Sequence, residues 1–289
     1  MPVNVQPHPL ASSRMFLDIE TEAHEDAEKW LGIGEPTAHD LTIEQLKTIC
    51  GDAGLEKGGK KDDLIKRIYL EPIASTSLDE VLDSVKAFKR DEALAKAPLD
   101  HDLGKIRTIG AASNDGEIAV GIVWKDEDES VPKTFGNQKN RYAFQVVPYE
   151  NEAELIDAFW HNAVNHRLRM VGYNILNFDI PYLLRRSLDL GLWVPPKLNL
   201  RRYQIEPICD LMQILAHWDS RRYKSLKFIC NRYGIENPMP DIDGSMVATL
   251  NDPMTCRYQA SDVHIIRELW KRMDGVYWPQ TYNVPTRSR

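Results

Sequence analysis

The chain has 289 residues, of which 43% are hydrophobic and 27% are charged, and its formal net charge is -7. This composition excludes a disordered or fibrous chain and allows one large domain, or a larger domain that carries a small one. The sequence has neither an apolar run long enough to cross a membrane nor the start of a signal peptide. We therefore expect an intracellular protein, cytoplasmic or nucleoid-associated, that makes no membrane contact.

The spacing of the cysteines and the distribution of charge along the chain each narrow the kinds of site to expect. The four cysteines lie far apart with no CxxC pair, a pattern that favours buried thiols over a zinc ribbon or a disulfide framework. Between Trp160 and Arg232 the chain holds twelve Lys and Arg against five Asp and Glu. Such a basic stretch is typical of a phosphate-binding face or of ordinary solvated surface.

The N-terminal region predicts an arm followed by an acidic strand. Residues 1–14 contain three prolines and no periodicity, so we expect a flexible arm. Residues 15–20 predict a buried strand that carries Asp18 and Glu20. Because strand side chains repeat every two residues, both carboxylates face one side, where they repel each other unless a cation lies between them.

Residues 37–97 predict a small helical module. Apolar residues at helical spacing indicate one helix over 41–50 and a second that contains Leu64, Ile65 and Ile68, while 77–97 predict a third. Two glycines before Lys60 and Lys61 predict a turn between the first two helices.

Beyond residue 98 the pattern changes to alternating strands and helices. A hairpin is predicted around Asn114-Asp115-Gly116. The predicted strands are 105–112, 117–124, 142–147, 169–173 and 205–211, and the predicted helices are 151–167, 179–190, 222–233 and 258–273. This order predicts an α/β fold, with a mixed sheet covered by helices.

Two further acidic positions stand in apolar sequence. Asp179 lies at a strand-to-helix junction, and Asp262 follows Tyr258 by four residues on a predicted helix. Lone buried carboxylates are costly, but a divalent cation with oxygen ligands could satisfy them together with Asp18 and Glu20. The spacing of Tyr258 and Asp262 places a phenol on the same helix face as one proposed ligand. The pattern is that of a phosphodiester-cleaving centre.

Residues 41–70 resemble the SAP motif, a helix-loop-helix module that binds DNA. The resemblance rests on Gly54-Leu55, on the turn before Lys60 and Lys61, and on the run from Leu64 to Ile68. It implies that Lys60 and Lys61 contact phosphates. A helical hairpin without a ligand remains the alternative.

Three other segments resemble the motifs of DnaQ-like 3'-5' exonucleases, above all the proofreading domains of family B DNA polymerases. They are FLDIET at 16–21, GYNILNFDIPYLL at 172–184, and the pair Tyr258 and Asp262. The resemblance implies an RNase H-like fold in which Asp18, Glu20, Asp179 and Asp262 bind two divalent cations, Mg²⁺ or Mn²⁺. It also implies that Tyr258 positions the attacking water, as in the tyrosine-containing (DEDDy) subgroup.

The family joins its first two strands by a short linker, so the helical module is an insertion. We expect a discontinuous RNase H-like domain over 15–36 and 98–273, an inserted SAP-like module over 37–97 and a C-terminal tail over 274–289. The insert either holds substrate near the catalytic residues, or acts as a lid or as a docking arm for a partner.

Three residues beside the second motif are candidate nucleic-acid contacts. Tyr173 and Phe178 either stack on a terminal base or belong to the core, and Asn174 either bonds substrate or caps the following helix. The expected activity is a metal-dependent 3'-5' exonuclease on DNA, with single strands favoured and nucleoside 5'-monophosphates released. The alternatives are an RNA exonuclease and a non-catalytic nucleic-acid-binding protein; protein partners are not indicated.

Overall fold

The computed structural model describes residues 14–125, 133–136, 139–167, 169–196 and 198–277. It divides into two compact units. We call residues 14–22 with 105–277 the sheet unit, and residues 23–104 the helical unit. Apart from Arg14, the expected arm lies outside the described residues, as does the expected tail beyond Tyr277.

Arg14, which we expected in the arm, instead belongs to the folded sheet unit. Its side chain is fully buried, its guanidinium lies 4.7 Å from the ring centroid of Trp270, and it forms an ion pair with Glu206. A buried cation needs such partners, and these contacts hold Arg14 in place at the start of the first strand.

Seven strands of the described chain form one sheet in the order β4-β5-β3-β2-β1-β6-β7. Their bounds are β1 Met15–Ala23, β2 Gly104–Ala112, β3 Ile118–Val123, β4 Thr134–Gly136, β5 Arg141–Tyr149, β6 Met170–Gly172 and β7 Ile208–Asp210. β2 and β3 form the predicted antiparallel hairpin, whereas β1 with β6, β6 with β7, and β3 with β5 pair in parallel. The sheet is therefore mixed, as predicted.

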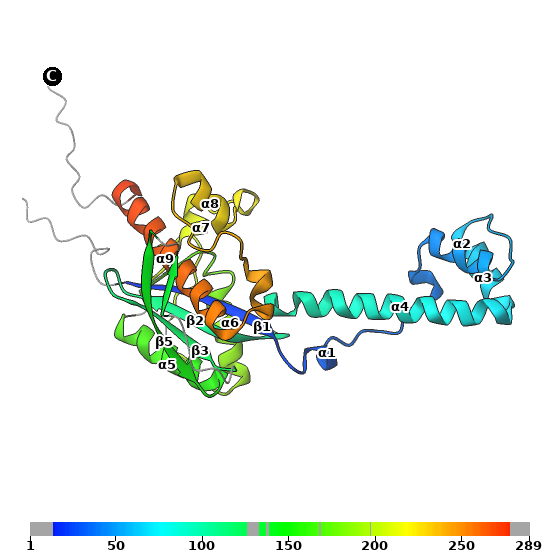
Figure 1. Ribbon diagram of the computed structural model, residues 1–289, viewed down its shortest axis with the longest axis horizontal. Coiled ribbons are helices and arrows are strands. Elements are labelled where there is room, and N and C mark those ends of the chain that lie inside the picture. Colours follow the sequence, from blue (N-terminus) through cyan, green and yellow to red (C-terminus); the bar gives the residue numbers. More distant parts are fainter. Residues whose placement is uncertain (1–13, 126–132, 137–138, 168, 197, 278–289) are drawn as a thin grey trace, which may run out of the picture. The chain divides into compact units, whose positions relative to one another are not determined.

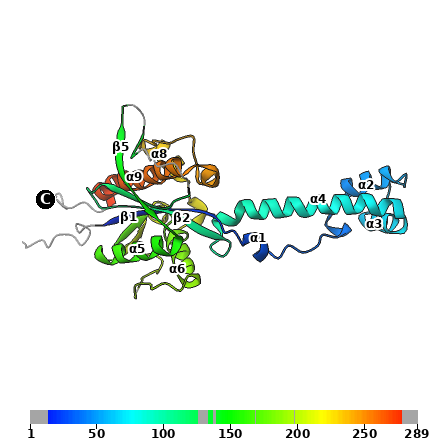
Figure 2. The same cartoon turned by 60° about the horizontal axis from the view of Figure 1, so that its bottom comes forward.

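Helices cover both faces of this sheet (Figure 2). One face carries α5 Glu152–Asn165 and α6 Asp179–Asp189, and the other carries α7 Leu211–Leu215, α8 Leu226–Tyr233 and α9 Asp252–Tyr277. Separate apolar cores lie on the two faces; Trp160 is buried in the first and Trp270 in the second. This arrangement is the RNase H-like α/β fold that the sequence predicted.

The helical unit contains α1 Ala27–Trp30, α2 Ile43–Asp52, α3 Lys61–Leu70 and α4 Pro72–Lys96 (Figure 1). The Thr42 hydroxyl caps α2 by accepting a hydrogen bond from the backbone N–H of Gln45. Leu46, Ile49 and Leu64 are among the residues that form its own core between α2, α3 and α4. The two ends of the unit meet, because the N–H of His24 donates to the carbonyl of Leu103 at 2.9 Å.

Some elements differ from the prediction for local reasons. α9 begins at Asp252, six residues before the expected start, since the Asn251 side chain caps it by accepting from the N–H of Met254 at 3.0 Å. β4 and α7 were not expected; three and five residues are too few to show a period. All four cysteines are buried and free of disulfides, as predicted. No helix within the described residues has the length and apolar character needed to cross a membrane.

Candidate active site

β1 places two carboxylates on the face of the sheet that α9 covers. Phe16 packs in the core on the α9 side, whereas Leu17 and Ile19 pack on the side of α5 and α6. Because side chains alternate along a strand, Asp18 and Glu20 project with Phe16 toward α9. Glu20 is only 8% exposed. The predicted juxtaposition of these two acids is therefore present.

α9 brings a third carboxylate to the same place. Tyr258 and Asp262 lie one turn apart, and their side chains are hydrogen-bonded to each other. One carboxylate oxygen from each of Asp18, Glu20 and Asp262 lies within 4.8 Å of the others. Ligand oxygens on opposite sides of an Mg²⁺ ion stand about 4 Å apart, so one divalent cation can contact this set.

Asp179 reaches the cluster from the first residue of α6. Its Oδ1 accepts a hydrogen bond from the backbone N–H of Ile19 at 3.1 Å, and the residue is 3% exposed. Ile19 lies between Asp18 and Glu20 on β1, so the carboxylate of Asp179 stands beside both. The structure thus collects the four predicted acids from one strand and two helices.

The electrostatics of the cluster are unfavourable without a cation. Burial, reinforced by the neighbouring carboxylates, raises the pKa of Asp18 and Glu20 well above the ordinary range. Burial also raises the pKa of Asp179 and of Asp262 to about 7. Among the described residues, no Lys or Arg forms an ion pair with these four acids. An all-oxygen, strongly acidic donor set of this kind fits divalent cations such as Mg²⁺ or Mn²⁺.

Tyr258 remains a neutral hydroxyl in this setting. Burial, followed by the charges of Asp262, Glu20 and Asp18, raises the pKa of its phenol far above the ordinary value. The ring packs against Met239 and Val247. A protonated phenol held at the edge of an acidic cluster can donate one hydrogen bond and accept another, which suits it to orienting a water molecule.

Asp210 holds the loop that leads to Asp179, and the sequence analysis did not identify it. Its carboxylate accepts hydrogen bonds from the backbone N–H groups of Asn174 and Leu176, both at 3.1 Å. Asn174 adopts a left-handed backbone conformation at φ 67°, which Asn tolerates better than most residues. The available signal was an acid at the end of an apolar strand, the same signal that identified Asp18.

The predicted nucleic-acid contacts near this loop have internal partners. The Tyr173 hydroxyl donates to the carbonyl of Lys224 at 2.6 Å. Phe178 is half-buried with its ring centroid 5.4 Å from that of Tyr182. The Asn174 side chain accepts from Asn177 at 2.9 Å and so does not cap α6. These contacts give each of the three residues a role in shaping the loop.

Lys60 and Lys61 lie at the start of α3, in the helical unit. Lys60 is exposed, and its backbone N–H donates to Asp63 at 3.0 Å. The ammonium of Lys61 donates to the carbonyl of His39 at 2.6 Å, which fixes the side chain and leaves two of its donors. Lys60 is thus the more available of the two for a phosphate.

Two buried side chains support the cluster from outside the predicted motifs. Gln259 donates from Nε2 to Oδ2 of Asp18 at 2.8 Å. Arg107 donates to the carbonyls of Val247 and Leu250 at 2.7 and 2.9 Å, and it pairs with Asp252. Arg107 thereby fixes the segment that enters α9. No sequence pattern marked these residues, because their partners are distant in the chain.

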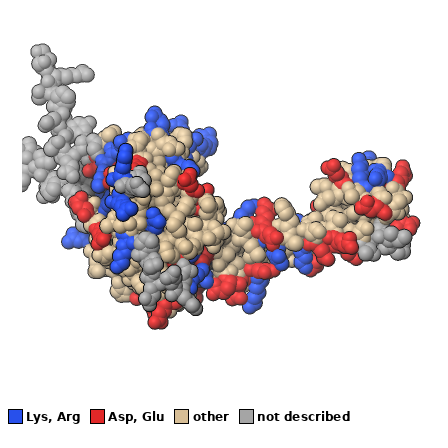
Figure 3. Space-filling view, in the orientation of Figure 1, with Lys and Arg blue, Asp and Glu red and all other residues tan. Residues whose placement is uncertain are grey.

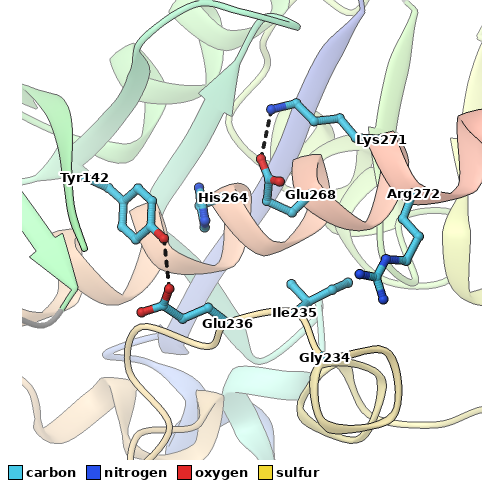
Figure 4. A pocket seen from close by; sticks show the side chains of 8 residues that line it. All are labelled: Tyr142, Gly234, Ile235, Glu236, His264, Glu268, Lys271 and Arg272. Carbon is cyan, nitrogen blue, oxygen red and sulfur yellow. Dashed lines mark hydrogen bonds and ion pairs between the residues drawn. The ribbon is translucent and has the colours of Figure 1, made fainter. Parts of the chain in front are cut away.

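A separate cavity of about 540 Å³ lies elsewhere on α9 (Figure 4). None of the four acids lines it. Its walls carry two acidic and two basic side chains, and the ring of His264 contacts that of Tyr142 at a tilt of 39°, with 4.0 Å between ring centroids. This balance of charge indicates no particular ligand, so the cavity adds nothing to the acidic cluster.

Comparisons with known proteins address the same two regions. Residues 117–268, just over half of the chain, match a family model described as a predicted 3'-5' exonuclease related to the exonuclease domain of PolB. Residues 38–69 match the model of the SAP domain. A search of curated proteins finds no match to this chain.

Proposed function

Because the chain belongs to the family of predicted 3'-5' exonucleases related to the exonuclease domain of PolB, and carries a SAP domain, we propose that it removes nucleotides one at a time from the 3' end of DNA. Water attacks the terminal phosphorus, the bond to the 3' oxygen of the preceding nucleotide breaks, and a nucleoside 5'-monophosphate leaves. The observation that carries this proposal is the meeting of Asp18, Glu20 and Asp262 within 4.8 Å, with Asp179 bonded to β1 beside them.

The four acids would hold two divalent cations, Mg²⁺ or Mn²⁺. When bound, such ions lower the pKa of the attacking water and stabilise the leaving 3' oxygen. Asp18 and Glu20 would supply ligands from β1, which lies between β2 and β6, while Asp179 and Asp262 would supply them from helices on the two faces of the sheet. A raised pKa in all four favours this role, since bound cations remove the repulsion between them.

Tyr258 would orient the attacking water rather than bind a cation. Its hydroxyl stays protonated and is already fixed by Asp262, so a water molecule beside the cluster can bond to it in a constant position. Positioned groups of this kind accelerate hydrolysis by fixing the line of attack.

Single-stranded DNA is the favoured substrate because exposed aromatic and basic side chains occur together on the sheet unit. Tyr203 is 69% exposed, and its ring centroid lies 5.6 Å from that of Trp218. Both residues hold left-handed backbone conformations, and Arg221 and Arg222 follow shortly after Trp218. Lys and Arg also gather over the region of α8 (Figure 3). Stacking platforms flanked by arginines are typical of proteins that bind single strands.

The proposal is tested with one oligonucleotide labelled at either end. A 5'-labelled strand should give a descending ladder, and a 3'-labelled strand should release labelled mononucleotide from the first time point, only with Mg²⁺ or Mn²⁺ present. Asp262→Asn should remove the activity without unfolding the chain. Binding without metal-dependent cleavage would favour the non-catalytic alternative, and faster cleavage of a matched RNA strand would favour the RNA exonuclease.

A further inference from the structure

Two buried residues of β2 and α9 form a chain of hydrogen bonds that ends on Asp18. The Thr108 hydroxyl lies 2.6 Å from Oε1 of Gln259, and Nε2 of Gln259 lies 2.8 Å from Oδ2 of Asp18. Thr108 and Gln259 are both 0% exposed. We propose that Thr108 and Gln259 are positioning residues that set the orientation of the Asp18 carboxylate toward a divalent cation. This inference rests on the proposed function.

The polarity of the chain follows from its last member. A carboxylate that binds a cation is ionised and only accepts hydrogen bonds, so the amide of Gln259 must present its NH₂ group to Asp18. The amide oxygen then faces Thr108, whose hydroxyl donates to it. Because neither side chain reaches water, reversing the amide would turn its oxygen toward the carboxylate of Asp18, where two buried acceptors would face each other. Thr108 therefore holds the amide of Gln259 by its oxygen, in the orientation that Asp18 requires.

Gly110 provides the space in which Gln259 reaches the strand. A Cβ atom at Gly110 would lie 2.8 Å from Cγ of Gln259 and 3.0 Å from its Nε2. Contacts that short would displace the amide from Asp18. Thr108 and Gly110 stand two residues apart on β2, next to β1 in the sheet. The glycine leaves room for Gln259 and also for Val263, whose Cγ2 would lie 2.6 Å from that Cβ atom.

The effect on the carboxylate is directional. A hydrogen bond at Oδ2 stops rotation of the Asp18 group and leaves Oδ1 as the oxygen free of the amide hydrogen. A ligand that is held in one rotamer loses less entropy when it binds a cation. The chain of hydrogen bonds runs from Thr108 to Gln259 to Asp18 and includes none of the other three acids. Thr108 therefore acts on the cation through Gln259.

The test measures cation affinity rather than activity. The full-length chain is titrated with Mn²⁺, and the electron paramagnetic resonance signal of free Mn²⁺ reports the dissociation constant. Gln259→Met keeps the length of the side chain and removes the donor, and should raise the dissociation constant of one ion by roughly 10 to 100 fold. Thr108→Val keeps the shape and removes the hydroxyl, and should raise it by roughly 10 fold.

Thr108→Ser is the matched control, since it restores the hydroxyl and should bind Mn²⁺ like the wild type. Thr108→Val should add no further loss to Gln259→Met, because the two act in series. Unfolding measured in EDTA identifies any variant that fails to fold. If Gln259→Met fails to fold, the comparison of Thr108→Val with Thr108→Ser decides alone. Wild-type affinity in Thr108→Val overturns this inference and leaves the proposed function standing. A wild type that binds no Mn²⁺ and cleaves no DNA overturns both.

Discussion

Replacing Asp179 with Asn should stabilise the metal-free protein at pH 8. Burial raises the pKa of Asp179 from 3.8 to about 7. Each tenfold change in proton affinity is worth about 1.4 kcal/mol, so the ionised carboxylate costs up to about 4 kcal/mol. The full cost is not recovered, because neighbouring acids that bind protons already reduce the repulsion on Asp179 in the wild type. Asn keeps the acceptor for the Ile19 N–H, so we expect a net gain of about 1 to 3 kcal/mol in the free energy of unfolding.

The gain should depend on pH with a definite sign. Between pH 4 and 7 the folded wild type holds a proton on Asp179 that the unfolded chain has lost, so its stability falls as pH rises through this range. Asn cannot ionise. The difference between variant and wild type should therefore be largest at pH 8 and smallest at pH 4.5.

Urea unfolding in EDTA at the two pH values measures this difference. Asp252→Asn is the matched control, because Asp252 is fully buried but paired with Arg107 at 2.9 Å. Removing that charge leaves Arg107 with only Glu22, at 3.9 Å, as an ion-pair partner among the described residues, so this variant should be less stable than the wild type at both pH values. The reasoning would be refuted if Asp179→Asn were no more stable than the wild type at pH 8. It would also be refuted if the stability gain were as large at pH 4.5 as at pH 8.

Three other predictions concern rate, modularity and substrate holding. Tyr258→Phe should lower turnover by roughly 10 to 1,000 fold with an unchanged Mn²⁺ dissociation constant; a large change in that constant would make Tyr258 part of the cation site. Replacing residues 24–103 by a short turn should leave a folded, metal-dependent nuclease, because a hydrogen bond already joins the ends of that segment; circular dichroism and cleavage of short oligonucleotides test this. Lys60→Glu with Lys61→Glu should raise the apparent KM for long DNA and flatten its salt dependence, whereas unchanged binding would assign the helical unit another role.

The sequence was sufficient to predict the features that depend on local pattern. Asp18 and Glu20 share a face because a strand alternates, and Tyr258 and Asp262 share one because a helix turns every 3.6 residues. The mixed sheet followed from the hairpin and the later alternation of strands and helices. The four acids were grouped because each is a costly lone carboxylate in apolar sequence, and the resemblance gave the same set; the structure brings them together.

The support of that cluster could not be predicted in this way. Gln259 contacts Asp18 across 241 positions of the chain, and Arg107 contacts Asp252 across 145. No periodicity records such pairings, which arise only when α9 packs on the sheet. Arg14 was wrongly assigned to the arm, because it is a polar residue at the end of a proline-rich segment. Its burial depends on Glu206 and Trp270, which are distant in the chain.

The meeting of His24 and Leu103 also has a consequence for how the chain folds. β1 and β2 are neighbours in the sheet, yet about 80 residues separate them. The entropic free-energy cost of closing a loop of that length is about 3 kcal/mol higher than that of closing a four-residue turn. A helical unit with its own core can form first and bring its two ends together, so the sheet then closes across a gap no longer than a turn. We therefore expect folding to run from the inserted segment outward, so that slow folding of the helical unit would delay assembly of the strands on either side of it.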